Sequence, residues 1–209
     1  MPDAPTETLP LRERKKQRTR ETLEAAALRL TSERGLEGTT VEAIAAEAEV
    51  SPRTFARYFR SKEEAVVGHP GEMLERFRKA IVATPDADEL TVVRDALVRL
   101  AVALEDDREV QLTRMHLARD VPVLRYRLLE WRQLFELTLA EALATRAGTT
   151  EPPLRAQILA AVAIAAMSVA SQRWAEGDGT TSLRDELSAV LDVVLDDIAP
   201  YAAARRQAR

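Results

Sequence analysis

The sequence predicts an all-α protein, and its composition and its apolar patterning both support this class. Gly accounts for only 7 of the 209 residues and aromatic residues for 4%, which disfavours a β-sandwich or barrel. Ala, Leu, Glu and Arg, all strong helix formers, are the most frequent residues. Apolar residues recur at i, i+3, i+4 and i+7 in successive segments, which is the spacing of one helix face. An apolar fraction of 46% and a net charge of −4 exclude a wholly disordered chain.

The first helix is expected from about Leu11–Arg14 to Arg34. Leu23, Ala26 and Leu30 lie on its apolar face, and Gly35 suits the left-handed residue that follows a helix. Residues 11–30 hold seven basic and three acidic side chains, net +4. Such a segment is compatible with a DNA-binding end, and equally with a solvated helix start.

Two short helices are expected next. Thr39-Thr40-Val41-Glu42 matches a capping box, with Thr39 as N-cap and Glu42 reaching back to it, for a helix that ends near Glu49. Ser51 as N-cap and Pro52 at the first helical position predict a further helix to Phe59. The length and the turn are typical of a helix-turn-helix at about residues 40–59, although a fragment of an ordinary helical bundle would have the same spacing.

The rest of the chain predicts more helices, about nine in all, without internal repeats. The longest apolar run, residues 158–170, has 13 residues and falls short of the roughly 20 that a bilayer span needs. Residues 1–10 are polar and precede a basic stretch, so no signal peptide is expected. A cytoplasmic protein with no membrane partner is therefore predicted.

Polar side chains around the second short helix are suited to DNA. Arg53 can donate two parallel hydrogen bonds to the major-groove edge of guanine. Hydroxyl and ammonium donors near the helix starts suit phosphate contacts, and these are Thr40, Ser51, Thr54, Tyr58 and Lys62.

Residues from about Arg18 to Ala65 resemble the DNA-binding domain of the tetracycline-repressor (TetR) family of bacterial regulators. The resemblance rests on T-V-x-x-I-A at 40–45, V-S-x-x-T at 50–54 and Y-F-x-S-K-E at 58–63. It implies a helix-turn-helix domain at 11–65 and an effector-binding and dimerisation domain at 66–209.

The same resemblance assigns roles to single residues. It places Pro52, Arg53 and Thr54 at the reading end of the recognition helix, and Thr40, Tyr58 and Lys62 on the DNA backbone. Ala56 stands where many members carry an aromatic residue, so its base contact is reduced to a methyl group, and Arg57 is a candidate to replace it.

The implied function is that of a homodimeric transcriptional regulator, most simply a repressor that a small organic effector releases from double-stranded operator DNA. A DNA-binding architectural protein without a ligand is the alternative. A third possibility is an all-α small-molecule-binding protein or enzyme with an incidental helix-turn-helix.

The body of the chain offers candidates for the effector pocket and the dimer. Bulky or adaptable side chains could line a pocket or simply fill the core, and these are Met115, His116, Trp131, Phe135, Met167 and Trp174. Their character predicts an apolar or amphipathic effector, with any anionic group near Arg114 or His116. An Ala-rich run and the last apolar stripe predict a dimer interface that includes Ala166, Ala170, Val190 and Val194, with packing inside one chain as the alternative.

No enzyme activity, cofactor or metal site is expected. The chain has two His and no Cys, and it lacks both a Gly-rich phosphate loop and a His-Glu-x-x-His motif.

Overall fold

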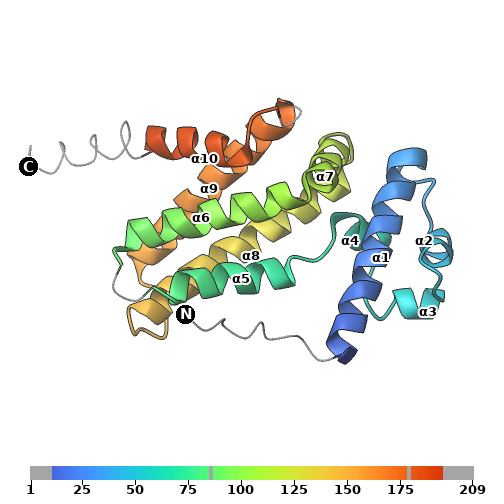
Figure 1. The fold of residues 1–209 in the computed structure, drawn as a ribbon, viewed down its shortest axis with the longest axis horizontal. Coiled ribbons are helices and arrows are strands. Elements are labelled where there is room, and N and C mark those ends of the chain that lie inside the picture. Colours follow the sequence, from blue (N-terminus) through green and yellow to red (C-terminus); the bar gives the residue numbers. More distant parts are fainter. Residues whose placement is uncertain (1–10, 85–86, 178–179, 195–209) are drawn as a thin grey trace, which may run out of the picture. The chain divides into compact units, whose positions relative to one another are not determined.

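A computed structural model describes residues 11–84, 87–177 and 180–194 (Figure 1). Over these residues the regular structure consists of ten α-helices and no strand, which confirms the all-α class. The chain divides into two compact units, with the boundary between His69 and Pro70.

Unit 1 is a small helical domain built on one long helix. Its elements are α1 (Leu11–Arg34), α2 (Val41–Glu47), α3 (Pro52–Phe55) and α4 (Lys62–Val67). The long helix α1 packs against α2 and α4, and α2 packs against α3. The centre of this core is fully buried and apolar, and it includes Leu23, Ala27, Leu30, Ile44, Ala45, Phe55, Phe59, Ala65 and Val66.

The start of α2 differs from the expected capping box by one residue. Thr40, not Thr39, is the N-cap, and its side chain accepts a hydrogen bond from the Ala43 backbone N–H (3.1 Å). Thr39 is fully buried, and its hydroxyl donates to the Gly35 carbonyl (2.9 Å). Burial thus uses the first threonine for packing and leaves the second, exposed one to cap the helix.

The turn between α2 and α3 contains a left-handed residue. Glu49 has φ +54°, a conformation that costs a residue with a side chain about 1–2 kcal/mol. The element expected from Pro52 to Phe59 is α-helical only as far as Phe55. It continues in tighter turns, with the Tyr58 N–H donating to the Phe55 carbonyl (2.8 Å).

The short helix α4 belongs to unit 1, which ends at His69, four residues beyond the expected end of the DNA-binding domain at residue 65. Ala65, Val66 and Val67 are buried, and α4 packs on α1. Gly68, with φ +86° and ψ −166°, ends the helix in a conformation that only glycine adopts readily.

Unit 2 contains the remaining helices around a single core. They are α5 (Gly71–Val82), α6 (Glu89–Asp106), α7 (Arg108–Asp120), α8 (Pro122–Arg146), α9 (Leu154–Glu176) and α10 (Leu183–Asp192). The α8 helix packs against α5, α7 and α9, while α10 packs against α9 and α6. The expected apolar stripe of the last helix runs on to Ile198, which lies outside the described residues.

A single arginine closes the corner between α5 and α6. The Arg146 guanidinium donates to the carbonyls of Ile81 (3.1 Å), Thr84 and Ala87 (2.7 Å). Carbonyls at a helix end have no partner within the helix, so this side chain from α8 supplies what α5 lacks.

The α9 helix is the most apolar one. By length and composition alone it could cross a membrane, since it has 23 residues and its most apolar 18-residue window has a mean hydropathy of 1.7. Nine of its residues are buried in the core of unit 2. The core helix of a soluble protein passes the same test of length and composition.

Candidate DNA-binding and effector sites

Two phenylalanines attach α3, and the turn that follows it, to the core of unit 1. The rings of Phe55 and Phe59 lie 5.6 Å apart, and each side chain is almost completely buried. Pro52, Arg53 and Arg57 are exposed on the outside of the same segment. The packing therefore fixes the backbone of this turn while leaving two guanidinium groups free to reach a partner.

Hydroxyl groups stabilise the start of the turn. The Ser51 side chain accepts from the Thr54 backbone N–H (3.1 Å), and the two side-chain hydroxyls lie 2.9 Å apart. Thr40, Ser51 and Thr54 are thus engaged in capping, and they retain hydrogen-bonding capacity on their oxygens.

Arg20 on α1, which no sequence motif singles out, packs against this region. The Arg20 guanidinium lies 6.0 Å from the centroid of the Tyr58 ring and 5.6 Å from that of Phe59. Such cation–π contacts orient the half-buried Tyr58. The only sequence signal for this role of Arg20 is the basic character of α1.

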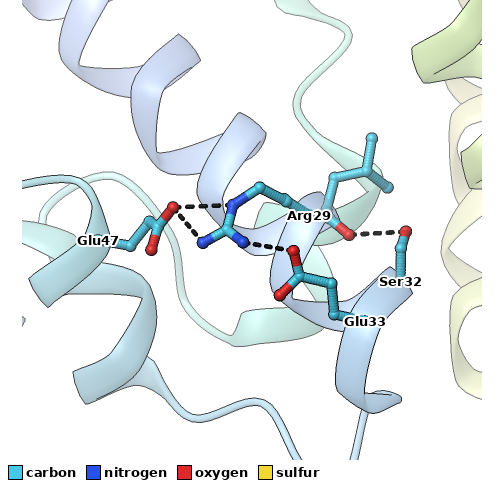
Figure 2. Close-up of polar contacts among 5 residues, drawn as sticks. Arg29, Ser32, Glu33 and Glu47 are labelled. Atoms are coloured by element: carbon cyan, nitrogen blue, oxygen red, sulfur yellow. Dashed lines mark hydrogen bonds and ion pairs between the residues drawn. The ribbon is translucent and has the colours of Figure 1, made fainter.

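A second arginine fastens α2 to α1 (Figure 2). Arg29 Nε donates to Glu47 Oε1 (2.8 Å), and its guanidinium also bonds Glu33 one turn further along α1. These hydrogen bonds, the one to Glu47 first, raise the pKa of Arg29. The C-terminal end of α2 is thereby bonded to α1.

Lys62 has a structural role that the sequence did not predict. Its ammonium group donates to the carbonyls of Leu36 (2.7 Å) and Thr39 (2.8 Å), in the turn that leads into α2. Two of its three donors are therefore used inside unit 1, and the third is left for the expected contact with the DNA backbone. The two turn carbonyls explain this, because buried acceptors need donors.

In unit 2, a groove of about 370 Å³ lies where α7, α8 and α9 meet. Its lining combines apolar and charged side chains, and consists of Met115, His116, Ala118, Arg119, Arg125, Leu128, Gln172, Ala175 and Glu176. His116 Nε2 donates to the Ala175 carbonyl (3.1 Å), which ties α7 to α9. Two of the six expected pocket residues, Met115 and His116, thus line the groove.

The other four expected pocket residues do not line this groove. Phe135, Met167 and Trp174 are buried in the unit 2 core, with the Phe135 ring edge-on to Phe77 at 5.5 Å. Trp131 is half-buried on α8. Within the described part of the chain, the buried indole N–H of Trp174 has no hydrogen-bond partner.

Two of the expected dimer residues, Ala166 and Ala170 on α9, are buried within the single chain. Ala166 and Ala170 are 4% and 0% exposed within the single chain, so their methyl groups pack against its own core. Val190 also packs partly on that core, and Val194 is half-buried. The exposed apolar side of α9 is formed instead by Leu154, Ile158, Val162 and Val169.

Comparisons with known proteins agree with this architecture. Residues 23–66 match the profile of bacterial regulatory proteins of the tetR family, and residues 87–200, more than half of the chain, match that of the MftR C-terminal domain. The HTH-type transcriptional regulator TcmR of Streptomyces glaucescens is 31% identical over 198 residues, covering 91% of this chain and 87% of TcmR.

The chain belongs to the TetR family. It is therefore a helix-turn-helix DNA-binding transcriptional regulator, as the sequence predicted, and its family is one of regulators and not of enzymes.

Two solved structures of repressors share the fold. FadR of Thermus thermophilus, a repressor solved with lauroyl-CoA, has a TM-score of 0.57 and 24% identity over 84% of this chain and 93% of its own. NalD of Pseudomonas aeruginosa, the secondary repressor of the MexAB-OprM efflux pump, has a TM-score of 0.56 and 18% identity over 86% and 96%.

We expect Lys62→Met to lower the free energy of unfolding by about 1–3 kcal/mol, because two carbonyls of the α1–α2 turn lose their donor. Thermal denaturation followed by circular dichroism measures the change. Lys79→Met, at an exposed position on α5, is the control and should have little effect. Equal melting temperatures for the two variants would contradict the structural role of Lys62.

Proposed function

We propose that this TetR-family regulator is a homodimeric repressor that binds operator DNA through unit 1 and releases it when a small organic effector binds unit 2. The observation that carries the DNA-binding part is the exposed turn at α3, whose inner side is packed on the core of unit 1. Phe55 and Phe59 anchor it, and Arg53 and Arg57 project from it.

The proposal gives the candidate DNA-binding residues of unit 1 distinct roles. Arg53 reads guanine in the major groove, and Arg57 contacts a neighbouring base or phosphate. Thr40, Ser51 and Thr54 add contacts to the backbone from the helix starts. The hydroxyl of Tyr58, whose ring packs against Arg20, donates a hydrogen bond to a phosphate. Lys62 donates its third N–H to the DNA backbone.

The dimer in this proposal is formed by the exposed side of α9. Leu154, Ile158 and Val162 follow each other at intervals of four residues, with Val169 two turns further on, and together they form an apolar stripe. Pairing of α9 and α10 from two chains would bury this stripe in a four-helix bundle. An isologous contact of this kind would set the spacing of two reading turns on successive major grooves.

The effector in this proposal is an amphipathic organic anion bound in the groove between α7, α8 and α9. Met115, Leu128 and Ala175 offer apolar surface, while Arg119 and Arg125 offer charge for a carboxylate or phosphate. Effector binding would weaken DNA binding only to the extent that the two dimer states differ in their affinity for it.

We expect Arg53→Ala to cost about 1–3 kcal/mol on the preferred duplex and to relax base preference at the contacted position, because a base-edge contact is lost. Anisotropy with a duplex selected from a random pool by the purified protein, and with its single-base variants, measures both effects. Arg99→Ala, exposed on α6, is the control. Unchanged base preference in Arg53→Ala would show that another residue reads the site.

Val162→Arg should dissociate the dimer, because it places an unpaired charge in a desolvated interface. Light scattering at micromolar concentration should then fall from twice the mass of one 23.2 kDa chain to that of a single chain. Val102→Arg on α6 is the matched control, since Val162 and Val102 are 41% and 43% exposed. A dimer that survives Val162→Arg would place the interface elsewhere.

Decanoate, an amphipathic carboxylate, serves as a probe of the groove. We expect it to quench or shift the fluorescence of Trp131, which lies one helical turn from Leu128 on α8, and to bind about tenfold more weakly to Arg125→Gln. Neutral methyl decanoate is the control ligand. Operator DNA should weaken decanoate binding by the factor by which decanoate weakens DNA binding. Equal affinities of decanoate and its ester would contradict the role of the arginines.

A further inference from the structure

The first half of α1 is strongly basic, and most of its basic side chains take no part in the contacts described above. Residues 11–22 hold six basic and two acidic side chains, net +4, although the whole chain has a net charge of −4. Among the described residues, the ion pair in this stretch joins Lys16 and Glu13 at 3.8 Å.

Three of these cations line a groove in unit 1. The groove has a volume of about 520 Å³ and lies between α1 and the turn that joins α2 to α3. Arg14, Lys15 and Arg18 share it with Leu11, Thr19, Thr22, Ala48 and Val50, whereas Arg12 and Lys16 are not part of its lining. The basic helix therefore has one cationic face toward the helix-turn-helix and another away from it.

The groove is elongated and adjoins the reading turn. Its α1 wall extends from Leu11 to Thr22, about 16 Å at 1.5 Å per residue, which suits a strand with several phosphates better than a single small anion. Val50, on the opposite wall, directly precedes Ser51 and the first residues of α3. In Figure 1 the dark-blue start of α1 and α3 lie toward the same end of unit 1.

The cations are the donors that this groove presents. The hydroxyls of Thr19 and Thr22 donate to the carbonyls of Lys15 (3.0 Å) and Arg18 (2.9 Å) within α1, so they are already used. Arg14, Lys15 and Arg18 are exposed, and none of them takes part in the Lys16–Glu13 ion pair. Their charge complements the uniform negative charge of a DNA backbone.

We propose that this groove holds a sugar–phosphate strand of the operator beside the reading turn, with Arg14, Lys15 and Arg18 as a sequence-independent contact. The inference rests on the proposed DNA-binding function and adds a second contact surface to it. Base readout stays with α3, and the groove fixes where the flanking strand lies.

The test is the salt dependence of binding to a duplex selected by the protein from a random pool. For the triple variant Arg14→Gln, Lys15→Gln, Arg18→Gln we expect the slope of log affinity against log salt to flatten by about two to three units. The ratio of affinities for the selected duplex and its single-base variants should stay unchanged. Glutamine preserves the helix, because its helix propensity is close to that of Lys and Arg.

The matched control removes the same charge from unit 2. Arg99, Arg132 and Arg184 are exposed, and their triple replacement by Gln should leave the salt slope unaltered. A second control, Arg12→Gln with Lys16→Gln, removes charge from the other face of α1 and should have a smaller effect than the groove variant.

A second measurement keeps the protein unaltered and neutralises the DNA. Methylphosphonate placed at single positions should weaken binding of the unaltered protein at the phosphates that the groove holds, and should have no effect there on the groove variant. If the groove variant keeps the slope of the unit 2 control, or if no phosphate shows this coupling, the inference is overturned while DNA binding stands. If the unaltered protein binds no duplex, the inference and the proposed function both fall.

Discussion

The helix-turn-helix of this protein depends on the burial of two phenylalanines. A reading element with one α-helical turn cannot hold its shape alone, because short helices in water are not stable. Phe55 and Phe59, each 2% exposed, attach the turn to the core of unit 1, and burial of such a side chain is worth about 1.5–3 kcal/mol. Everything that the turn presents to solvent, Arg53 above all, takes its position from that contact.

Cations complete the structure in places where the backbone leaves acceptors unpaired. Lys62 donates hydrogen bonds to two carbonyls before α2, and Arg146 donates to carbonyls around the C-terminus of α5. Arg20 instead covers two aromatic rings. The atoms within reach of a basic side chain thus decide whether it stabilises the fold or is available to contact DNA. A count of charges in the sequence does not distinguish these two roles.

The sequence predicted the helices well where their ends carry distinctive residues. Gly35 ends α1 with φ +73°, and Ser51 with Pro52 begins α3, because few residue types suit those backbone positions. Thr39 and Thr40 are equally good caps in isolation, so only burial distinguishes them. The capping box was misplaced for that reason.

The faces of α9 illustrate a different limit. Small residues such as Ala166 and Ala170 allow close helix packing, but the same pattern fits a contact with α8 in one chain or with a second chain. In the folded chain the alanines pack inside and the larger Ile158 and Val162 lie outside. Likewise, bulky residues such as Phe135 and Trp174 fill the core, because large apolar side chains serve packing at least as often as ligand binding.

The interruption between α4 and α5 determines how the two units can communicate. Because α4 is buried on α1 and Lys62 anchors its first turn, it moves with the reading domain, and the His69 N–H adds a bond to Glu24 of α1 (3.2 Å). Gly68 and Pro70 then prevent α4 and α5 from forming one continuous rod. Along the chain, α4 and α5 are therefore joined by residues 68–70 alone, and the backbone torsions of these three residues can change without breaking a hydrogen bond inside either helix.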